Sequence, residues 1–85
     1  MNVLIPSALR SYTQSSQAKA CGATLDDVLL DLDRQYPGIR FRVIDEQQRM
    51  RRHIRIFVNG VSADALSQTM QPCDELVIVQ ALSGG

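Results

Sequence analysis

The residues best suited to take part in a reaction are the last five of the chain, Ala81-Leu82-Ser83-Gly84-Gly85. Gly85 offers an α-carboxylate, and a glycine pair has no Cβ atoms, so its backbone can enter a narrow channel and approach a nucleotide phosphate closely. When extended, the last six residues reach roughly 20 Å at ~3.3–3.6 Å per residue, which is enough to enter another protein's active site. The alternative interpretation is a frayed end without function, because chain termini are commonly disordered.

The other reactive side chains form no catalytic or metal-binding pattern. Cys21 and Cys73 lie far apart, and His53 is the only histidine. A structural zinc site needs about four Cys, His or carboxylate ligands, so we expect no bound metal. We expect two free thiols rather than a disulfide. His53 is expected to be a strand-edge residue, and Ser83, which has no identifiable base, a small spacer.

Length and charge restrict the function classes further. The chain has 85 residues, nine basic and nine acidic, and 45% of them are hydrophobic. One small domain leaves little room for an enclosed catalytic pocket, and zero net charge gives no general attraction to nucleic acid or an anionic membrane. The apolar stretches are too short to span a bilayer. The N-terminus lacks the features of a secretion signal, so we expect a cytoplasmic protein.

The basic residues are unevenly distributed. There are eight arginines and a single lysine, Lys19, and the stretch from Arg40 to Arg55 holds six arginines against two acidic residues. This pattern favours a solvated hairpin arm, and docking to an acidic partner or RNA is the alternative. Only Phe41 interleaves with the arginines and no nucleic-acid motif is present, so we expect no nucleic-acid partner.

Hydrophobic periodicity predicts short strands at residues 2–6, 17–21, 53–58, 61–63 and 75–79. Val3 and Ile5 lie on one face of the first strand and Leu4 on the other. Asn59-Gly60 is a strong hairpin signal. Residues 7–16 are expected to be a loop, and residues 45–53 a loop or a mobile hairpin arm. The segment before them carries four residues apolar enough to pack: Ile39, Phe41, Val43 and Ile44.

One amphipathic helix is predicted after residue 24. Thr24 and Asp27 form a Thr-x-x-Asp capping box, and an apolar stripe follows at helical spacing, Leu25, Val28, Leu29 and Leu32. Pro37-Gly38 ends the helix. Because one apolar stripe covers only one sheet face, the elements predict an α+β two-layer domain whose other sheet face meets solvent or a partner.

A family resemblance is carried by residues along essentially the whole chain. They are Ile5-Pro6-Ser7-Ala8-Leu9-Arg10, Thr24-Leu25, Val28, Asp31-Leu32, Tyr36-Pro37-Gly38-Ile39-Arg40, Asp45-Glu46, Arg49, Arg52-His53-Ile54, Ile56-Phe57-Val58-Asn59-Gly60, Asp74-Glu75-Leu76, Ile78 and Ser83-Gly84-Gly85. In order and spacing they resemble the small sulfur carriers of the MoaD/ThiS family, which have the ubiquitin-like β-grasp fold. The middle segment is most similar to the branch linked to cysteine and related sulfur-amino-acid biosynthesis. The chain departs from many members at Cys73, where they have glycine, and at Gln80, where they have proline.

The resemblance implies a mixed, mostly antiparallel sheet of four to five strands with one main helix on one face. Residues 1–79 would form the β-grasp domain, and residues 80–85 a flexible tail ending in Gly-Gly. The implied strand order places four apolar residues side by side on the face opposite the helix: Leu4, Phe57, Val77 and Val79. Apolar side chains gathered on an open face mark a candidate partner interface, although scattered surface hydrophobes are normal.

The resemblance also implies a carrier cycle in which the chain is a substrate rather than an enzyme and binds no cofactor. An E1-like adenylating enzyme would use Mg-ATP to convert the Gly85 carboxylate to an acyl-adenylate. A sulfurtransferase or other sulfur donor would then replace AMP, giving a thiocarboxylate that donates sulfur to a biosynthetic enzyme. A processing peptidase could trim the chain to Gly85.

Three other functions stay open. The chain could be a ubiquitin-like modifier conjugated through Gly85, the small subunit of a molybdopterin-synthase-like complex, or a β-grasp binding module with an inert tail. Because Lys19 is the single lysine, chains of self-linked modifiers have at most one side-chain acceptor. The final sulfur acceptor also stays open among cysteine or homocysteine precursors, molybdopterin, thiazole and specialised metabolites.

Overall fold

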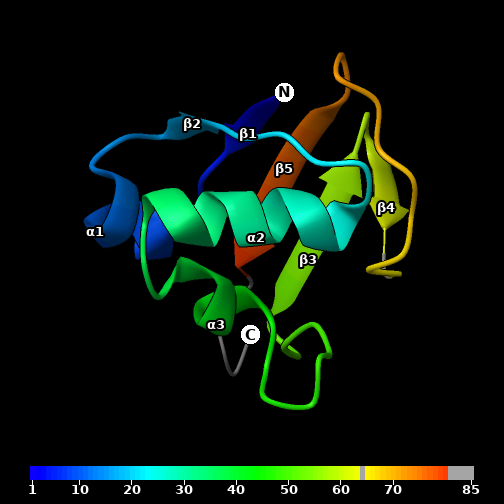
Figure 1. The fold of residues 1–85 in the computed structure, drawn as a ribbon. Coiled ribbons are helices and arrows are strands. Elements are labelled where there is room, and N and C mark those ends of the chain that lie inside the picture. The colour runs from blue at the N-terminus through cyan, green and yellow to red at the C-terminus, as the bar shows by residue number, and fades with distance from the viewer. Residues whose placement is uncertain (64, 81–85) are drawn as a thin grey trace.

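Five strands form one mixed sheet in the order β2-β1-β5-β3-β4 (Figure 1). The computed structural model describes residues 1–63 and 65–80. The strands are β1 (Asn2–Leu4), β2 (Gln17–Lys19), β3 (Ile54–Val58), β4 (Val61–Ala63) and β5 (Glu75–Gln80). β1 and β5 are parallel, and the other three pairs are antiparallel. The five predicted strands are thus confirmed, but their ends differ. β1 and β2 end two residues earlier than predicted, and β3 begins one residue later. β5 includes Gln80, so the assignment of Gln80 to the tail is wrong.

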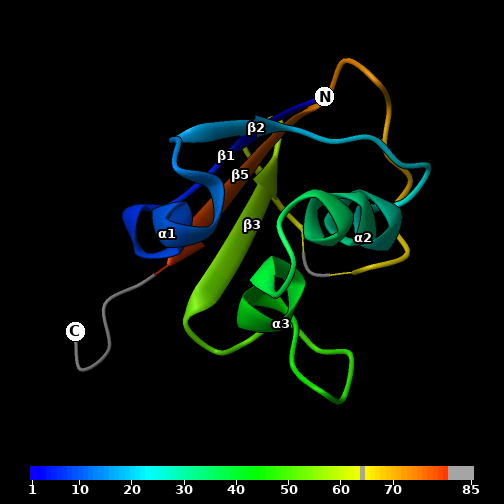
Figure 2. The same cartoon turned by 60° about the vertical axis from the view of Figure 1, so that its left-hand side comes forward.

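The main helix, α2 (Leu25–Gln35), covers one face of this sheet (Figure 2). The Thr24 side chain accepts a hydrogen bond from the Asp27 amide at 3.2 Å, as the predicted cap requires. All four residues of the predicted apolar stripe are buried. Gly38, with φ of +100°, turns the chain after the helix in a conformation that L side chains rarely adopt. The predicted helix and its two ends are confirmed.

The connecting segment before β5 closes the core against the start of α2. The amide of Leu25 donates to the Gln68 carbonyl at 2.9 Å, and the amide of Asp26 donates to the Leu66 carbonyl at 3.0 Å. These two donors are among the first N–H groups of a helix, which have no partner within the helix itself. Met70 in the same segment is buried in the core.

One region predicted to be a loop contains short helical segments. Residues 7–16, expected to be a loop, hold the 3-10 helix η1 (Ser7–Leu9) and α1 (Arg10–Thr13). Leu9 and Thr13 are buried there, four residues apart and so on one helical face. The hydrophobic pattern did not indicate a helix here because one of these two buried residues is polar.

A further helix, α3 (Ile39–Val43), lies on the same side of the sheet as α2 (Figure 2). Ile39, Val43 and Ile44 are buried as predicted, but Phe41 is 56% exposed, so its predicted packing is wrong. In a helix Ile39 and Val43 share a face, and Phe41, two residues from each, points the other way. The polar residues after α3 form a closed loop, since the Asp45 amide donates to the Arg49 carbonyl at 2.8 Å.

Candidate functional site

A row of apolar side chains crosses the sheet on the face that α2 leaves open. Val77 on β5 lies opposite Leu4 on β1 and opposite Phe57 on β3. Side chains alternate between the two faces of a strand, and the residues on either side of each of these three are buried against the helices. Leu4, Val77 and Phe57 therefore share the outer face, where each is half-buried.

Val79 continues this apolar surface toward the end of β5. It lies two residues beyond Val77, opposite Arg55, and is 39% exposed. The row ends in polar residues on both sides, because Gln17 lies opposite Leu4 and Ser62 lies opposite Phe57. We call Leu4, Phe57, Val77 and Val79 the outer-face patch. The structure brings all four predicted residues onto one face, and their role in partner binding stays a prediction.

The predicted tail begins where this patch ends. Gln80 is the last described residue and pairs with Ile54 of β3. The candidate attachment residue Gly85 and the other four predicted tail residues, Ala81, Leu82, Ser83 and Gly84, lie outside the described residues. Their predicted role is therefore argued from the sequence and from the position of Gln80.

The other candidate side chains lie apart from one another. Cys21 and Cys73 are exposed and free, and His53 is exposed next to β3. The Cys21 amide donates to Asp31 at 3.0 Å. A hydrogen bond from Arg34, followed by this amide, lowers the pKa of the Asp31 carboxyl. In residues 1–63 and 65–80 no three His, Cys, Asp or Glu side chains gather as metal ligands.

The arginines between Arg40 and Arg55 are more ordered than the predicted solvated arm. Arg40 contacts Asp26 through Nη2 and Oδ1 at 2.7 Å, and its side chain is only 15% exposed. Arg51 donates from Nε to the Phe41 carbonyl at 2.7 Å, with its guanidinium 4.7 Å from the centre of the Phe41 ring. These arginines fix α3 and the loop after it, so the interpretation as a solvated arm is wrong for them.

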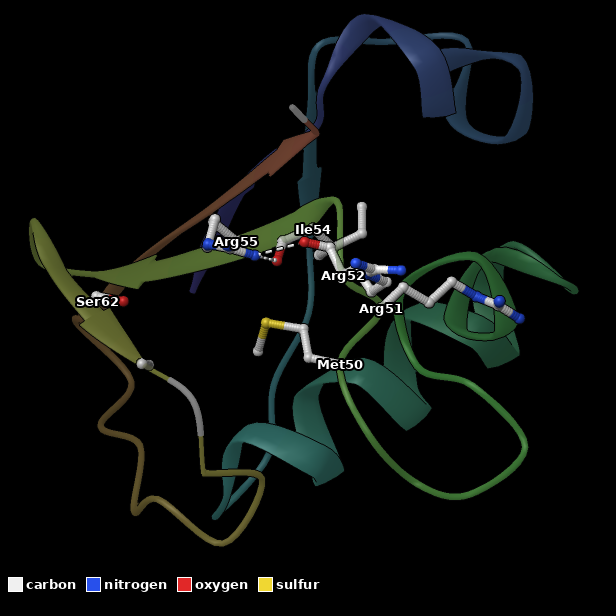
Figure 3. Close-up of a pocket in the computed structure, with 7 residues that line it drawn as sticks. Met50, Arg51, Arg52, Ile54, Arg55 and Ser62 are labelled. Carbon is white, nitrogen blue, oxygen red and sulfur yellow. Dashed lines mark hydrogen bonds between the residues drawn. The ribbon is translucent and has the colours of Figure 1, made fainter. Parts of the chain in front are cut away.

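Sequence reasoning missed a pocket at the edge of β3 next to these arginines (Figure 3). Its lining residues are Met50, Arg51, Arg52, Ile54, Arg55, Ser62 and Ala63. The cluster of arginines was visible in the sequence, but nothing in it indicated that the loop after α3 folds back beside β4.

A search of the described residues for a membrane-spanning helix, one both long and apolar, found none.

Comparisons with known proteins agree with this geometry. The model of the ThiS family matches residues 3–85. The sulfur carrier protein CysO of Mycobacterium tuberculosis is 31% identical over 91 residues, covering 100% of this chain and 98% of the relative. A chain in the crystal structure of the Amycolatopsis orientalis BexX/CysO complex superposes with a TM-score of 0.90 at 30% identity, covering 99% of this chain and 98% of that one.

A second kind of relative has a similar structure. SAMP1 from Haloferax volcanii superposes with a TM-score of 0.80 at 28% identity, covering 100% of this chain and 98% of that one. The strand order and the superpositions identify the ubiquitin-like β-grasp fold that the sequence predicts. With a family match that includes both the outer-face patch and the terminal glycine pair, the chain belongs to the ThiS family.

Proposed function

We propose that this protein is a sulfur carrier whose Gly85 α-carboxylate is activated as an acyl-adenylate and converted to a thiocarboxylate. The observation that carries the proposal is the full-length similarity to CysO, a protein named as a sulfur carrier. The match to the ThiS family extends over the glycine pair, Gly84 and Gly85. The carboxylate of Gly85 is available either at the encoded end or after trimming by a peptidase.

The chemistry explains why activation is needed. A carboxylate is a poor electrophile, so an E1-like adenylating enzyme joins a Gly85 carboxylate oxygen to the α-phosphorus of Mg-ATP and releases pyrophosphate. Sulfide then attacks the carbonyl carbon, the bond to AMP breaks, and a thiocarboxylate forms. When the donor is a persulfide on a sulfurtransferase, a thiol must afterwards cleave the sulfur–sulfur bond. The bound sulfur is nucleophilic and is delivered without release as free sulfide.

The body of the protein contributes recognition rather than catalysis. The outer-face patch lies on the strand that leads to the tail, since Val77 and Val79 both belong to β5. An enzyme that binds this patch is positioned to receive the residues after Gln80. The catalytic groups, and the ATP and magnesium, belong to the partner, and the chain itself acts as substrate and carrier.

The consumer of the sulfur is a cytoplasmic biosynthetic enzyme. The similarity to CysO and the resemblance of the middle segment favour cysteine or a related sulfur amino acid as the product. A specialised metabolite or a cofactor is the other class of product. The crystallised BexX/CysO complex supports the idea that a protein of this fold docks on a partner protein.

A second function, protein modification through Gly85, is favoured by one observation. The chain resembles SAMP1, and the Haloferax volcanii protein is described as a small archaeal modifier. Modification uses the same activated Gly85, but a lysine amine of a target protein attacks in place of sulfur.

Intact mass spectrometry of the protein isolated from its own host tests both functions. Exchange of one oxygen for sulfur, confined to the C-terminal peptide, supports the carrier. Glycine pairs attached to lysines of other proteins support the modifier. If neither species is found in the host, and the purified protein forms no acyl-adenylate with its adenylating enzyme and ATP, both functions are wrong.

A further inference from the structure

The pocket at the edge of β3 exists because β4 is short. β4 pairs only with residues 56–58 of β3, so Ile54 and Arg55 extend past its end. The space beside them has a volume of about 570 Å³ (Figure 3). Three of its seven lining residues are arginines, and none of the seven is acidic. The described lining therefore carries positive charges and no negative ones, in a chain of zero net charge.

The backbone in this pocket is not available to a pairing strand. The Ile54 amide donates to the Arg51 carbonyl at 3.0 Å, and the Ile54 carbonyl accepts from Nη1 of Arg55 at 2.9 Å. A peptide that adds as a strand needs free edge groups, and those of Ile54 are already satisfied. A ligand must therefore be recognised by the side chains.

The positive charge available to a ligand comes from Arg52 and Arg55. Nη1 of Arg55 is held by the carbonyls of Arg52 and Ile54 at 2.7 and 2.9 Å, which fixes its guanidinium in place. The Arg52 side chain is exposed and donates to no other group in the described part of the chain. Guanidinium N–H groups match a carboxylate in geometry and charge.

Apolar surface lies beside these guanidinium groups. The thioether of Met50 points into the pocket (Figure 3). Ile54 and Ala63 also line it but are only 0% and 3% exposed, so the apolar surface open to a ligand belongs mainly to Met50. Arg51 lines the pocket but turns its guanidinium away, onto the ring of Phe41. A segment that carries Asp or Glu next to an apolar side chain fits both parts of the lining.

The position of the pocket indicates which protein supplies that segment. Ile54 lies opposite Gln80, the last described residue before the tail. Ser62, on the other side of the pocket, lies opposite Phe57 of the outer-face patch. The pocket thus borders both the patch and the start of the tail, so an enzyme that receives the tail lies against it.

We infer that the pocket binds an acidic segment of the adenylating enzyme, as a second docking contact beside the outer-face patch. The inference rests on the proposed function. Charges at the rim of an interface act mainly on the association rate and its salt dependence. Arg52→Gln, which removes no hydrogen bond of the fold, should weaken binding to that enzyme about three- to tenfold at low salt and much less at high salt.

The test compares wild type with Arg52→Gln and with Arg42→Gln, an exposed arginine of α3 outside the pocket. Affinity for the adenylating enzyme and the Michaelis constant for pyrophosphate release are measured at two salt concentrations. A salt-dependent loss for Arg52→Gln alone supports the inference. The inference is wrong if Arg52→Gln and Arg42→Gln have the same affinity and the same salt dependence. If wild type is never adenylated, the proposed function fails instead.

A second measurement tests the pocket without the enzyme. The ¹⁵N- and methyl-labelled protein is titrated with a capped hexapeptide of alternating glutamate and leucine, and separately with inorganic phosphate. Shift changes at the Met50 methyl and at Nε of Arg52 with the peptide, with the Met50 change lost in Arg52→Gln, support the inference. Equal changes with phosphate indicate a site for small anions and contradict an acidic protein segment, as does the absence of any change.

Discussion

Phe57 lies directly opposite Val77 in the antiparallel β3–β5 pair, on the sheet face that the helices leave open. Val77 is also the partner of Leu4, so one strand joins both halves of the apolar row. That strand leads directly to the residues proposed to carry sulfur. β5 therefore contributes to the outer-face patch, which is proposed for recognition, and it precedes Gly85, which is proposed to react.

The outer-face patch predicts that an acidic side chain at Val79 impairs activation without unfolding the protein. Val79 is 39% exposed, so Val79→Asp introduces a charge with access to water. Burying that charge against the adenylating enzyme should raise the Michaelis constant for this protein about 10- to 100-fold, as for an interface hot spot. Phe57→Asp should act in the same direction.

Val61→Asp is the matched control for the patch. Val61 is 69% exposed on β4 and lies opposite the buried Val58, so it belongs to the other sheet face. It should leave the Michaelis constant and the melting temperature close to those of wild type. The proposed patch is wrong if Phe57→Asp and Val79→Asp both leave activation unchanged in folded protein.

The terminal glycine predicts a separation of activity from stability. Deleting Gly85 removes the proposed attachment point, and adenylation should fall below detection. Every described core residue lies between Val3 and Ile78, so the melting temperature should not change. The measurements are pyrophosphate release, which accompanies adenylation, and thermal unfolding. A truncated protein that still accumulates a thiocarboxylate would show that the attachment point lies elsewhere.

Much of the fold was predictable because its signals are local. The cap at Thr24, the apolar stripe of α2 and the Asn59-Gly60 turn each need only a few neighbouring residues, and all three occur in the structure. The strand order was obtained from the family resemblance instead. Strand pairing between β1 and β5 joins residues more than 70 positions apart, and no periodicity encodes such a contact.

What the sequence did not reveal depends on the ends of elements and on long-range contacts. Residues 10–13 form too short a helix to show a period. The arginine stretch reads as a solvated arm because the partner of Arg40 is Asp26, which lies 14 residues earlier on another helix. The pocket exists only because β4 ends early, and strand ends are the least predictable part of a sheet.

Gly22 predicts a test of how closely the loop before α2 packs on that helix. A Cβ atom at Gly22 would lie 2.5 Å from the Val28 amide nitrogen and 2.7 Å from the Asp27 carbonyl carbon. Both are backbone atoms of the first helical turn, so they cannot move aside as a side chain can. Gly22→Ala should lower the free energy of unfolding by about 1–3 kcal/mol, measured by urea denaturation.

Gly60→Ala is the comparison that separates crowding from backbone strain. Gly60 has φ of +83°, and a Cβ atom there would meet nothing within 4 Å. Gly60→Ala should lower the free energy of unfolding by only about 1–2 kcal/mol, because alanine is disfavoured in the left-handed conformation. Gly60→Asn should recover part of that loss. A Gly22→Ala protein as stable as wild type would show that the loop moves away from α2 freely.

The ion pair between Asp26 and Arg40 predicts an energetic coupling between α2 and α3. Arg40 donates to Asp26 Oδ1 from both Nε and Nη2, at 3.1 and 2.7 Å. A double-mutant cycle with Asp26→Ala and Arg40→Ala should give a coupling of about 1 kcal/mol, the upper part of the range for partly exposed pairs. The coupling should decrease at high salt. Strict additivity of the two substitutions would mean that the contact contributes nothing to stability.

Asn59 and Asp74 link the β3–β4 turn to the start of β5. Asn59, with φ of +51°, donates from Nδ2 to Asp74 at 2.8 Å and accepts from the Glu75 amide at 2.9 Å. The Gln71 amide donates to the other carboxylate oxygen of Asp74 at 2.8 Å. The Gln71 amide, followed by the Asn59 side chain, lowers the pKa of the Asp74 carboxyl below its ordinary value of 3.8.

This lowered pKa predicts a loss of stability in acid. The unfolded chain binds the Asp74 proton more tightly than the folded chain does. The contribution of Asp74 to the free energy of unfolding is therefore complete above the ordinary pKa of the unfolded chain, and it is lost as the pH falls through the lowered pKa of the folded chain. The difference in unfolding free energy between wild type and Asp74→Asn should therefore shrink on acidification. Asn59→Gly keeps the left-handed turn but removes the Nδ2 donor, so the Asp74 pKa, followed by carboxyl NMR, should rise toward 3.8. An Asp74 that titrates at or above that value in wild type would show that these hydrogen bonds do not hold the carboxylate in solution.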